Sequence, residues 1–137
     1  MPRYVPIVVT PAIKAGHSNL LQFRWLDRRL VADFAIPEDS RVALRVEFQK
    51  AEIIRIVEEM PISTEHEATP NQGLVAHHFA YLVEGASFWS QQSETFKVVC
   101  QNAKHYRFLT GAYCLDVIAL DEPTFSVVAK KLETDQS

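Results

Sequence analysis

The sequence has few of the residues and none of the spacings from which common catalytic sites are built. Its 137 residues include only four glycines and two cysteines, and the patterns GxGxxG, GxxxxGK[ST], HExxH and CxxC are all absent. Phosphate-binding loops need glycine where the backbone approaches the phosphate, so a nucleotide-binding protein is not indicated. We therefore predict no catalytic residue, no cofactor and no metal ligand.

The chain also lacks a large excess of positive or negative charge. Lys and Arg number 14 against 17 Asp and Glu, which leaves a net charge of −3. Binding to nucleic acid or to anionic lipid usually relies on an excess of positive charge. We expect neither a nucleic-acid partner nor a membrane. The densest basic cluster is small, with Arg24, Arg28 and Arg29 beside Asp27.

Long apolar runs are missing too. The N-terminal stretch MPRYVPIVVTPAI is apolar, but Pro2, Pro6 and Pro11 interrupt it. A signal peptide or membrane helix needs a continuous apolar segment, so we expect a cytoplasmic protein. Thiols stay reduced in that compartment, and we expect Cys100 and Cys114 to remain unpaired.

What the sequence does contain is the composition of an ordinary globular domain. Hydrophobic residues make up 47% and charged residues 23% of the chain, which is too apolar for a disordered protein. A length of 137 residues is typical of one domain. We expect a single domain over 1–137, with a polar tail that frays over about 130–137.

The clearest pattern is a hairpin between His105 and Leu120, HYRFLTGAYCLDVIAL. Gly111 and Ala112 suit a two-residue type II′ turn, which requires a positive φ at its first central residue. The turn places Arg107 opposite Asp116 on one face and a large apolar set on the other. The predicted register also pairs Thr110 with Tyr113, Leu109 with Cys114, and Phe108 with Leu115.

Alternation of residue types predicts strands along most of the remaining chain. The most regular alternation covers 42–48, and β-branched residues favour a strand over 53–57. A helix over 45–60 is the alternative, since Glu, Lys, Ala and Arg are frequent there. A strand over 4–9 must be an edge strand, because Pro6 lacks a backbone N–H. Further strands are predicted at 21–25, 30–34, 74–83 and 124–129, with turns at Asp27-Arg28 and 37–40.

One short helix is predicted among these strands. Ser87 can cap a helix that runs to about Phe96, and residues 60–73 form a long loop. These elements predict a mainly β fold that borders on α+β. The expected architecture is an antiparallel sandwich or partly closed barrel with one short helix.

Candidate metal ligands are too dispersed for a tight site. His77 and His78 point to opposite sides of a strand and cannot both bind one ion. His105 lies diagonally from Asp116, a long reach for a site that needs three or four close ligands. Cys114 is better explained as a small buried side chain than as a nucleophile.

Four polar residues could still line a ligand pocket on the mixed face of the hairpin, namely His77, His105, Arg107 and Asp116. In a cleft, Arg107 and Asp116 could bind a carboxylate or phosphate. The simpler interpretation is a cross-strand ion pair, which contributes under about 1 kcal/mol when exposed. Trp89 and Tyr113 are the aromatic residues that we expect at the surface, where aromatic side chains anchor protein partners.

Several runs of the sequence occur in an order that is typical of one group of proteins. They are RVALRVEFQKAEIIRIVEE and, after it, FAYLVEGASFWSQQSETF, HYRFLT, CLDVIA and DEP. With them the chain resembles a loosely defined group of small bacterial proteins of unknown function, some of which are immunity-like. The resemblance implies a β-rich body and a bacterial origin, and it carries over no active-site residue. The matching positions are Phe79, Ser87, Phe88, His105, Tyr106, Asp116, Val117 and Pro123.

These observations favour a soluble, non-enzymatic module that binds a protein partner, with an immunity-like role implied by the resemblance. Exposed edge strands can pair with a partner or with a second copy, so a homodimer is also expected. The alternative is a small-molecule-binding protein or small hydrolase-like enzyme. It would use the polar pocket near the C-terminal hairpin.

Overall fold

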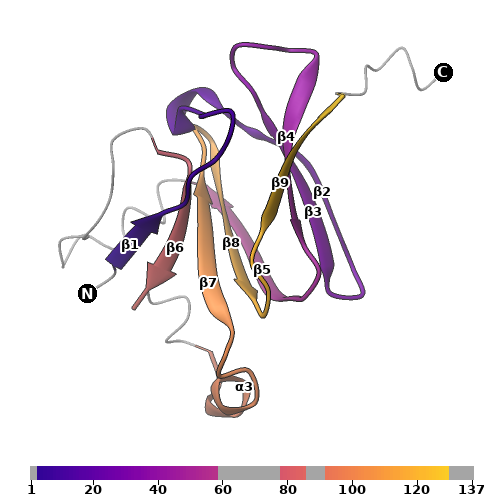
Figure 1. Ribbon diagram of the computed structural model, residues 1–137. Helices are drawn as coiled ribbons and strands as arrows, with labels where there is room; N and C mark the ends of the chain where they lie inside the picture. Colours follow the sequence, from indigo (N-terminus) through magenta and orange to yellow (C-terminus); the bar gives the residue numbers. More distant parts are fainter. Residues whose placement is uncertain (1–2, 59–77, 86–91, 130–137) are drawn as a thin grey trace.

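The computed structural model describes residues 3–58, 78–85 and 92–129. In these ranges two antiparallel sheets pack against each other as a β-sandwich (Figure 1), which confirms the predicted fold class. One sheet has the strand order β1-β6-β7-β8-β5 and the other β2-β3-β4-β9. The strands are β1 Arg3–Pro6, β2 Leu20–Leu26, β3 Arg29–Ala35, β4 Val42–Phe48, β5 Ala51–Glu58, β6 Ala80–Glu84, β7 Lys104–Leu109, β8 Tyr113–Ala119 and β9 Thr124–Ala129. Within the described ranges two helical segments accompany them, the 3-10 turn η1 Ala15–His17 and the helix α3 Glu94–Val99.

The main core lies between the two sheets. Alternate residues of β3 and β4 face it, and Leu44, Val46 and Phe48 are fully buried. This pattern confirms the strand over 42–48, so the alternative helix over 45–60 is wrong. Phe34 of β3 packs edge-on against Phe79, with ring centroids 4.8 Å apart. Such an aromatic pair stabilises the packing of the two sheets by about 0.5–1.5 kcal/mol, in addition to the contribution of the apolar area that it buries.

The predicted register of the C-terminal hairpin is confirmed. Arg107 of β7 lies opposite Asp116 of β8, and Phe108 lies opposite Leu115. Because side chains alternate along a strand, the charged pair is on the outer face of the five-stranded sheet. The apolar pair faces the core.

The predicted type II′ turn is wrong. Gly85 is the only glycine with a positive φ in the described ranges, so Gly111 does not adopt the conformation that this turn requires. The side chain of Thr110 closes the hairpin instead, with its Oγ1 accepting from the N–H of Tyr113 at 2.9 Å. Glycine is needed at 111 because a Cβ there would lie 2.7 Å from the carbonyl oxygen of Gly16.

The positive φ angles occur at the other predicted two-residue turn. Asp27 and Arg28 connect β2 and β3 with φ angles of 50° and 69°, which are typical of a type I′ turn. The predicted turn at 37–40 is present as well. There the N–H of Asp39 donates to the carbonyl of Ile36 at 3.1 Å.

Two elements differ from their predicted bounds. The helix α3 starts at Glu94, where the Ser93 side chain accepts from the N–H of Phe96 at 3.1 Å, and it continues past the predicted end at Phe96 to Val99. The predicted cap, Ser87, lies outside the described residues. Strand β6 starts at Ala80, so Phe79 precedes it and enters the inter-sheet core. Predictions for the loop over 60–73, the start of the strand over 74–83 and the tail over 130–137 lie outside the described residues.

The chain passes from one sheet to the other three times, between β1 and β2, between β4 and β5, and between β8 and β9. The second and third of these connections are neighbours. The carboxylate of Asp121 joins them, since it accepts from the N–H groups of Gln49 at 2.7 Å and Lys50 at 2.9 Å. Leu120 adds a backbone hydrogen bond to the carbonyl of Lys50 at 3.0 Å. These bonds hold one end of the sandwich together.

Candidate functional site

Three of the predicted site residues meet on the outer face of the five-stranded sheet. Asp116 Oδ1 lies 2.6 Å from His105 Nε2 and 2.6 Å from Arg107 Nε. Arg55 of β5, in register with Asp116, donates to its Oδ2 from Nη2 at 2.7 Å. Arg107 also donates to the hydroxyl of Tyr4 on β1. The buried cluster of these five side chains therefore connects four strands, and the expected long reach from His105 to Asp116 is in fact a direct contact.

The energetics of the cluster differ from those of an exposed ion pair. Arg107 and Asp116 are 0% exposed and His105 is 3% exposed. Burial alone would raise the pKa of Asp116. The hydrogen bond with His105 and the charge of Arg107 outweigh that effect and hold the pKa well below its usual range. Burial lowers the pKa of His105, although its contact with Asp116 acts in the opposite direction.

The buried cluster offers little access to a dissolved ligand. A depression of about 310 Å³ is lined by His105 together with residues of β6 and of the segment before β7, but not by Arg107 or Asp116. Because both of these side chains are fully buried, their charges are used within the protein. The cluster can hold neighbouring strands in register, and buried networks of this kind often specify a unique packing.

The other predicted site residues do not join this cluster in the described structure. His77 and Trp89 lie outside the described residues. Tyr113, at the start of β8, is 46% exposed, as expected for a surface residue. Cys114 is fully buried, which agrees with its assignment as a small core side chain.

A second candidate site was not predicted from the sequence. Phe23 and Trp25 of β2 pair with Ala32 and Leu30 of β3, so their side chains are on the core-facing side of the sheet. Yet Phe23 is 44% and Trp25 43% exposed, and Leu26 at the end of the strand is 75% exposed. We call β2, with these three side chains, the β2 edge. Among the described strands it pairs only with β3.

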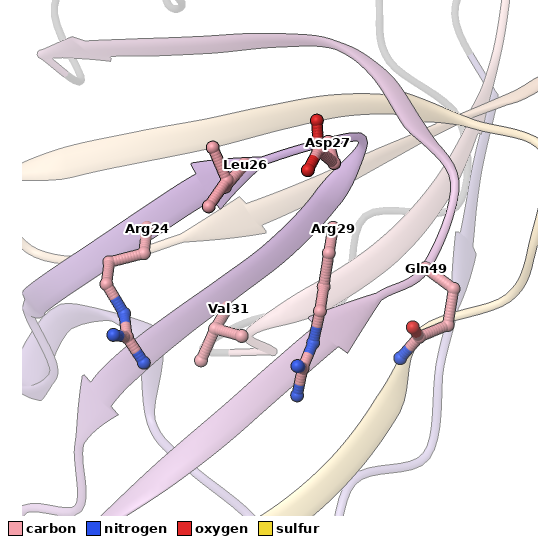
Figure 2. A pocket seen from close by; sticks show the side chains of 6 residues that line it. All are labelled: Arg24, Leu26, Asp27, Arg29, Val31 and Gln49. Atoms are coloured by element: carbon pink, nitrogen blue, oxygen red, sulfur yellow. The ribbon is translucent and has the colours of Figure 1, made fainter.

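The outer face of the sheet forms a depression beside the β2 edge. Its volume is about 490 Å³. Figure 2 shows the guanidinium groups of Arg24 and Arg29 pointing in the same direction on either side of Val31. The lining residues are Arg24, Leu26, Asp27, Arg29, Val31 and Gln49.

The sequence held one signal for this site. The run QFRW over 22–25 alternates polar and aromatic residues. It includes Arg24 of the basic cluster and contains no acidic residue itself. That alternation predicts a strand with one buried face, whether or not another sheet covers the face. Only the position of β2 at the end of its sheet leaves the aromatic side chains half exposed.

Comparison of the chain with protein-family models, with curated proteins and with solved structures finds no match in any of the three. Within the described ranges, no three His, Cys, Asp or Glu side chains are arranged to hold a metal ion. The helical segments described are too short or too polar to cross a membrane.

Proposed function

We propose that this protein is a non-enzymatic module that binds a protein partner through the β2 edge, in the immunity-like role that its sequence resemblance implies. The observation that supports this most directly is the exposure of Phe23 and Trp25 on a strand with one neighbour among the described strands. Aromatic side chains are enriched at the energetic centres of protein interfaces. An open strand edge adds backbone groups that a partner can pair with.

The buried cluster supports the same proposal indirectly. Its most distinctive side chains, Arg107 and Asp116, are inside the protein and bonded to their neighbours. Catalysis on a dissolved substrate needs such groups within hydrogen-bond reach of the reacting atoms. The cluster therefore serves as a rigid support for the sheet, and among the described residues the β2 edge is the exposed surface that we assign to partner binding.

The proposal can be tested by differential capture followed by reconstitution. The wild-type chain and the Phe23→Lys variant are used as baits in native lysate, with Val127→Lys as the matched control. Val127 is 49% exposed and also faces inward, but it lies on β9 at the opposite edge of the same sheet. Circular dichroism establishes that each variant is folded.

We expect at least one protein to be captured by the wild type and by Val127→Lys, and to be lost with Phe23→Lys. That protein, once purified, should bind the purified chain with the same dependence on residue 23. The proposed function is refuted if no purified candidate binds, or if binding does not change in the Phe23→Lys variant.

A further inference from the structure

The β2 edge has two chemically different faces. In register with β3, Phe23 and Trp25 lie on the core-facing side, and Arg24 lies on the outer side opposite Val31. Leu30, the neighbour of Trp25, is fully buried, whereas Trp25 itself is half exposed. An extended segment placed next to β2 would continue both faces of the sheet. Its side chains would then alternate between an apolar environment and a basic one.

Arg24 differs from the other arginines of this region. Arg28 pairs with Glu52, and Arg29 pairs with Glu47 at 3.0 Å. In the described part of the chain the side chain of Arg24 makes neither an ion pair nor a hydrogen bond. Its positive charge helps to lower the pKa of the nearby Asp33 carboxylate, but Asp33 forms its ion pair with Arg45. The guanidinium of Arg24 can therefore still contact a ligand that reaches the outer face.

The depression next to Arg24 can receive a carboxylate side chain. Its volume of about 490 Å³ is within the range of small-ligand sites. Arg24 and Arg29 flank Val31 within it (Figure 2). A carboxylate between them would meet the charge of Arg24 and part of that of Arg29, since Arg29 also interacts with Glu47. Asp27 lines the same depression, so the two arginines outnumber one acidic side chain there. Charge-assisted contacts of arginine with carboxylates are among the stronger hydrogen bonds.

A second copy of this chain is a poor occupant of the β2 edge. The strand LLQFRWL contains Arg24 and no Asp or Glu. A symmetric pairing of two β2 strands would bring two arginines to the same face without a carboxylate between them. Like charges on neighbouring strands are destabilising, and a basic residue on an edge strand is one way in which proteins prevent self-association.

From these contacts we propose that the partner contributes an extended segment with alternating acidic and apolar residues, which adds to β2 as a fifth strand of its sheet. The acidic side chains would lie over Arg24, and the apolar ones would pack beside Phe23 and Trp25. This assignment rests on the proposed function, whose partner it describes by its chemistry. It predicts that recognition combines backbone pairing with charge selection.

The test uses three short synthetic peptides on the full chain. In the first, Glu and Ile alternate; in the second, Lys replaces Glu; the third is the Glu peptide with alternate backbone nitrogens methylated, which blocks strand pairing. Binding and amide exchange of 20–26 are followed by NMR. Arg24→Gln and Arg24→Glu are compared with Arg3→Gln, a control on the exposed edge strand β1 of the other sheet.

We expect the Glu peptide to bind and to slow amide exchange in β2. Arg24→Gln should weaken its binding by about threefold to fivefold, the effect of losing one partly exposed ion pair. Arg24→Glu should reverse the preference toward the Lys peptide, and Arg3→Gln should change neither. N-methylation should abolish binding, because it removes the backbone donors of the added strand.

Each of the following results would overturn the inference. Equal binding of the Glu and Lys peptides would remove the acidic assignment. Equal binding of the methylated peptide, or competition by free glutarate at similar affinity, would identify a carboxylate site without strand addition. A dimer by light scattering that Phe23→Lys dissociates would assign the edge to a second copy. If a captured protein needs residue 23 but is insensitive to Arg24→Glu, this inference fails and the proposed function stands.

Discussion

Replacement of Asp116 by Asn is the sharpest test of the buried cluster. Asp116 is fully buried and bonds His105, Arg107 and Arg55 at 2.6 to 3.0 Å. Asn keeps the size of the side chain but removes the charge, which leaves Arg107 buried without its counterion. Removal of one partner from a buried ion pair costs about 3–5 kcal/mol of unfolding free energy. Domains of this kind have only about 5–15 kcal/mol in total.

The loss can be measured by urea denaturation at pH 7, followed by circular dichroism. With a urea m-value of about 1.5 kcal/mol/M, we expect the midpoint to fall by about 2–3 M. Asp33→Asn is the matched control. Asp33 is also buried and bonds Arg45 at 2.8 Å, but the Arg45 side chain is 30% exposed and can turn to water. That variant should lose only about 1–2 kcal/mol.

The pH dependence provides a second measurement on the same variant. Because the pKa of Asp116 in the folded protein lies below its unfolded value near 3.9, its contribution is complete above about pH 4 and is lost as the pH falls further. The difference between wild type and Asp116→Asn should therefore shrink below about pH 4. A loss under about 1 kcal/mol at pH 7, the value for an exposed pair, would refute the assignment of a stabilising role to the buried charges.

Three further predictions concern the turns and His105. Gly111→Ala should destabilise the protein by about 1–3 kcal/mol, because its Cβ would meet the Gly16 carbonyl at 2.7 Å; Gly16→Ala, whose Cβ meets nothing within 4 Å, should stay within about 0.5 kcal/mol in the same urea titration. The double change Asp27→Asn and Arg28→Gly should raise the melting temperature, since both positions have a positive φ and Asn-Gly relieves about 1 kcal/mol of backbone strain; an unchanged or lower melting temperature would contradict this. Since the folded pKa of His105 is lowered by burial, its contribution is complete above the unfolded value near 6.5 and is lost as the pH falls. His105→Gln should therefore flatten the dependence of unfolding free energy between about pH 7 and pH 5, and an unchanged slope would argue against a buried neutral imidazole.

The strands were predictable because their signal is local. Side chains of a strand alternate between its two faces, so the run from Val42 to Phe48 reveals its inward residues without knowledge of what covers them. The pairing of Arg107 with Asp116 follows in the same way from a short connection. The turn type was not predictable, because glycine is required at 111 by the close approach of the Gly16 carbonyl, which belongs to a loop distant in the sequence.

The candidate sites depended on long-range packing to different degrees. The residues His105, Arg107 and Asp116 were named from the sequence, but their complete burial changes them from a possible pocket lining into an internal support. For the residues of the β2 edge, the sequence predicted a strand and nothing about its exposure. Its aromatic residues alternate like those of a covered strand, and nothing in their order indicates that Phe23 remains half exposed.

The sequence by itself determined the strand periodicity, the register of the C-terminal hairpin and the mainly β, antiparallel fold class, because these follow from neighbouring residues and short turns. It left a sandwich and a partly closed barrel as alternatives. Pro6 indicated one edge strand in advance, and β1 does end its sheet. Only the tertiary structure decided that β2 ends the other sheet, which faces are covered, and which charges are buried. The physical reason is that burial and dielectric environment are set by segments far apart in the chain, such as Arg55 and Asp116.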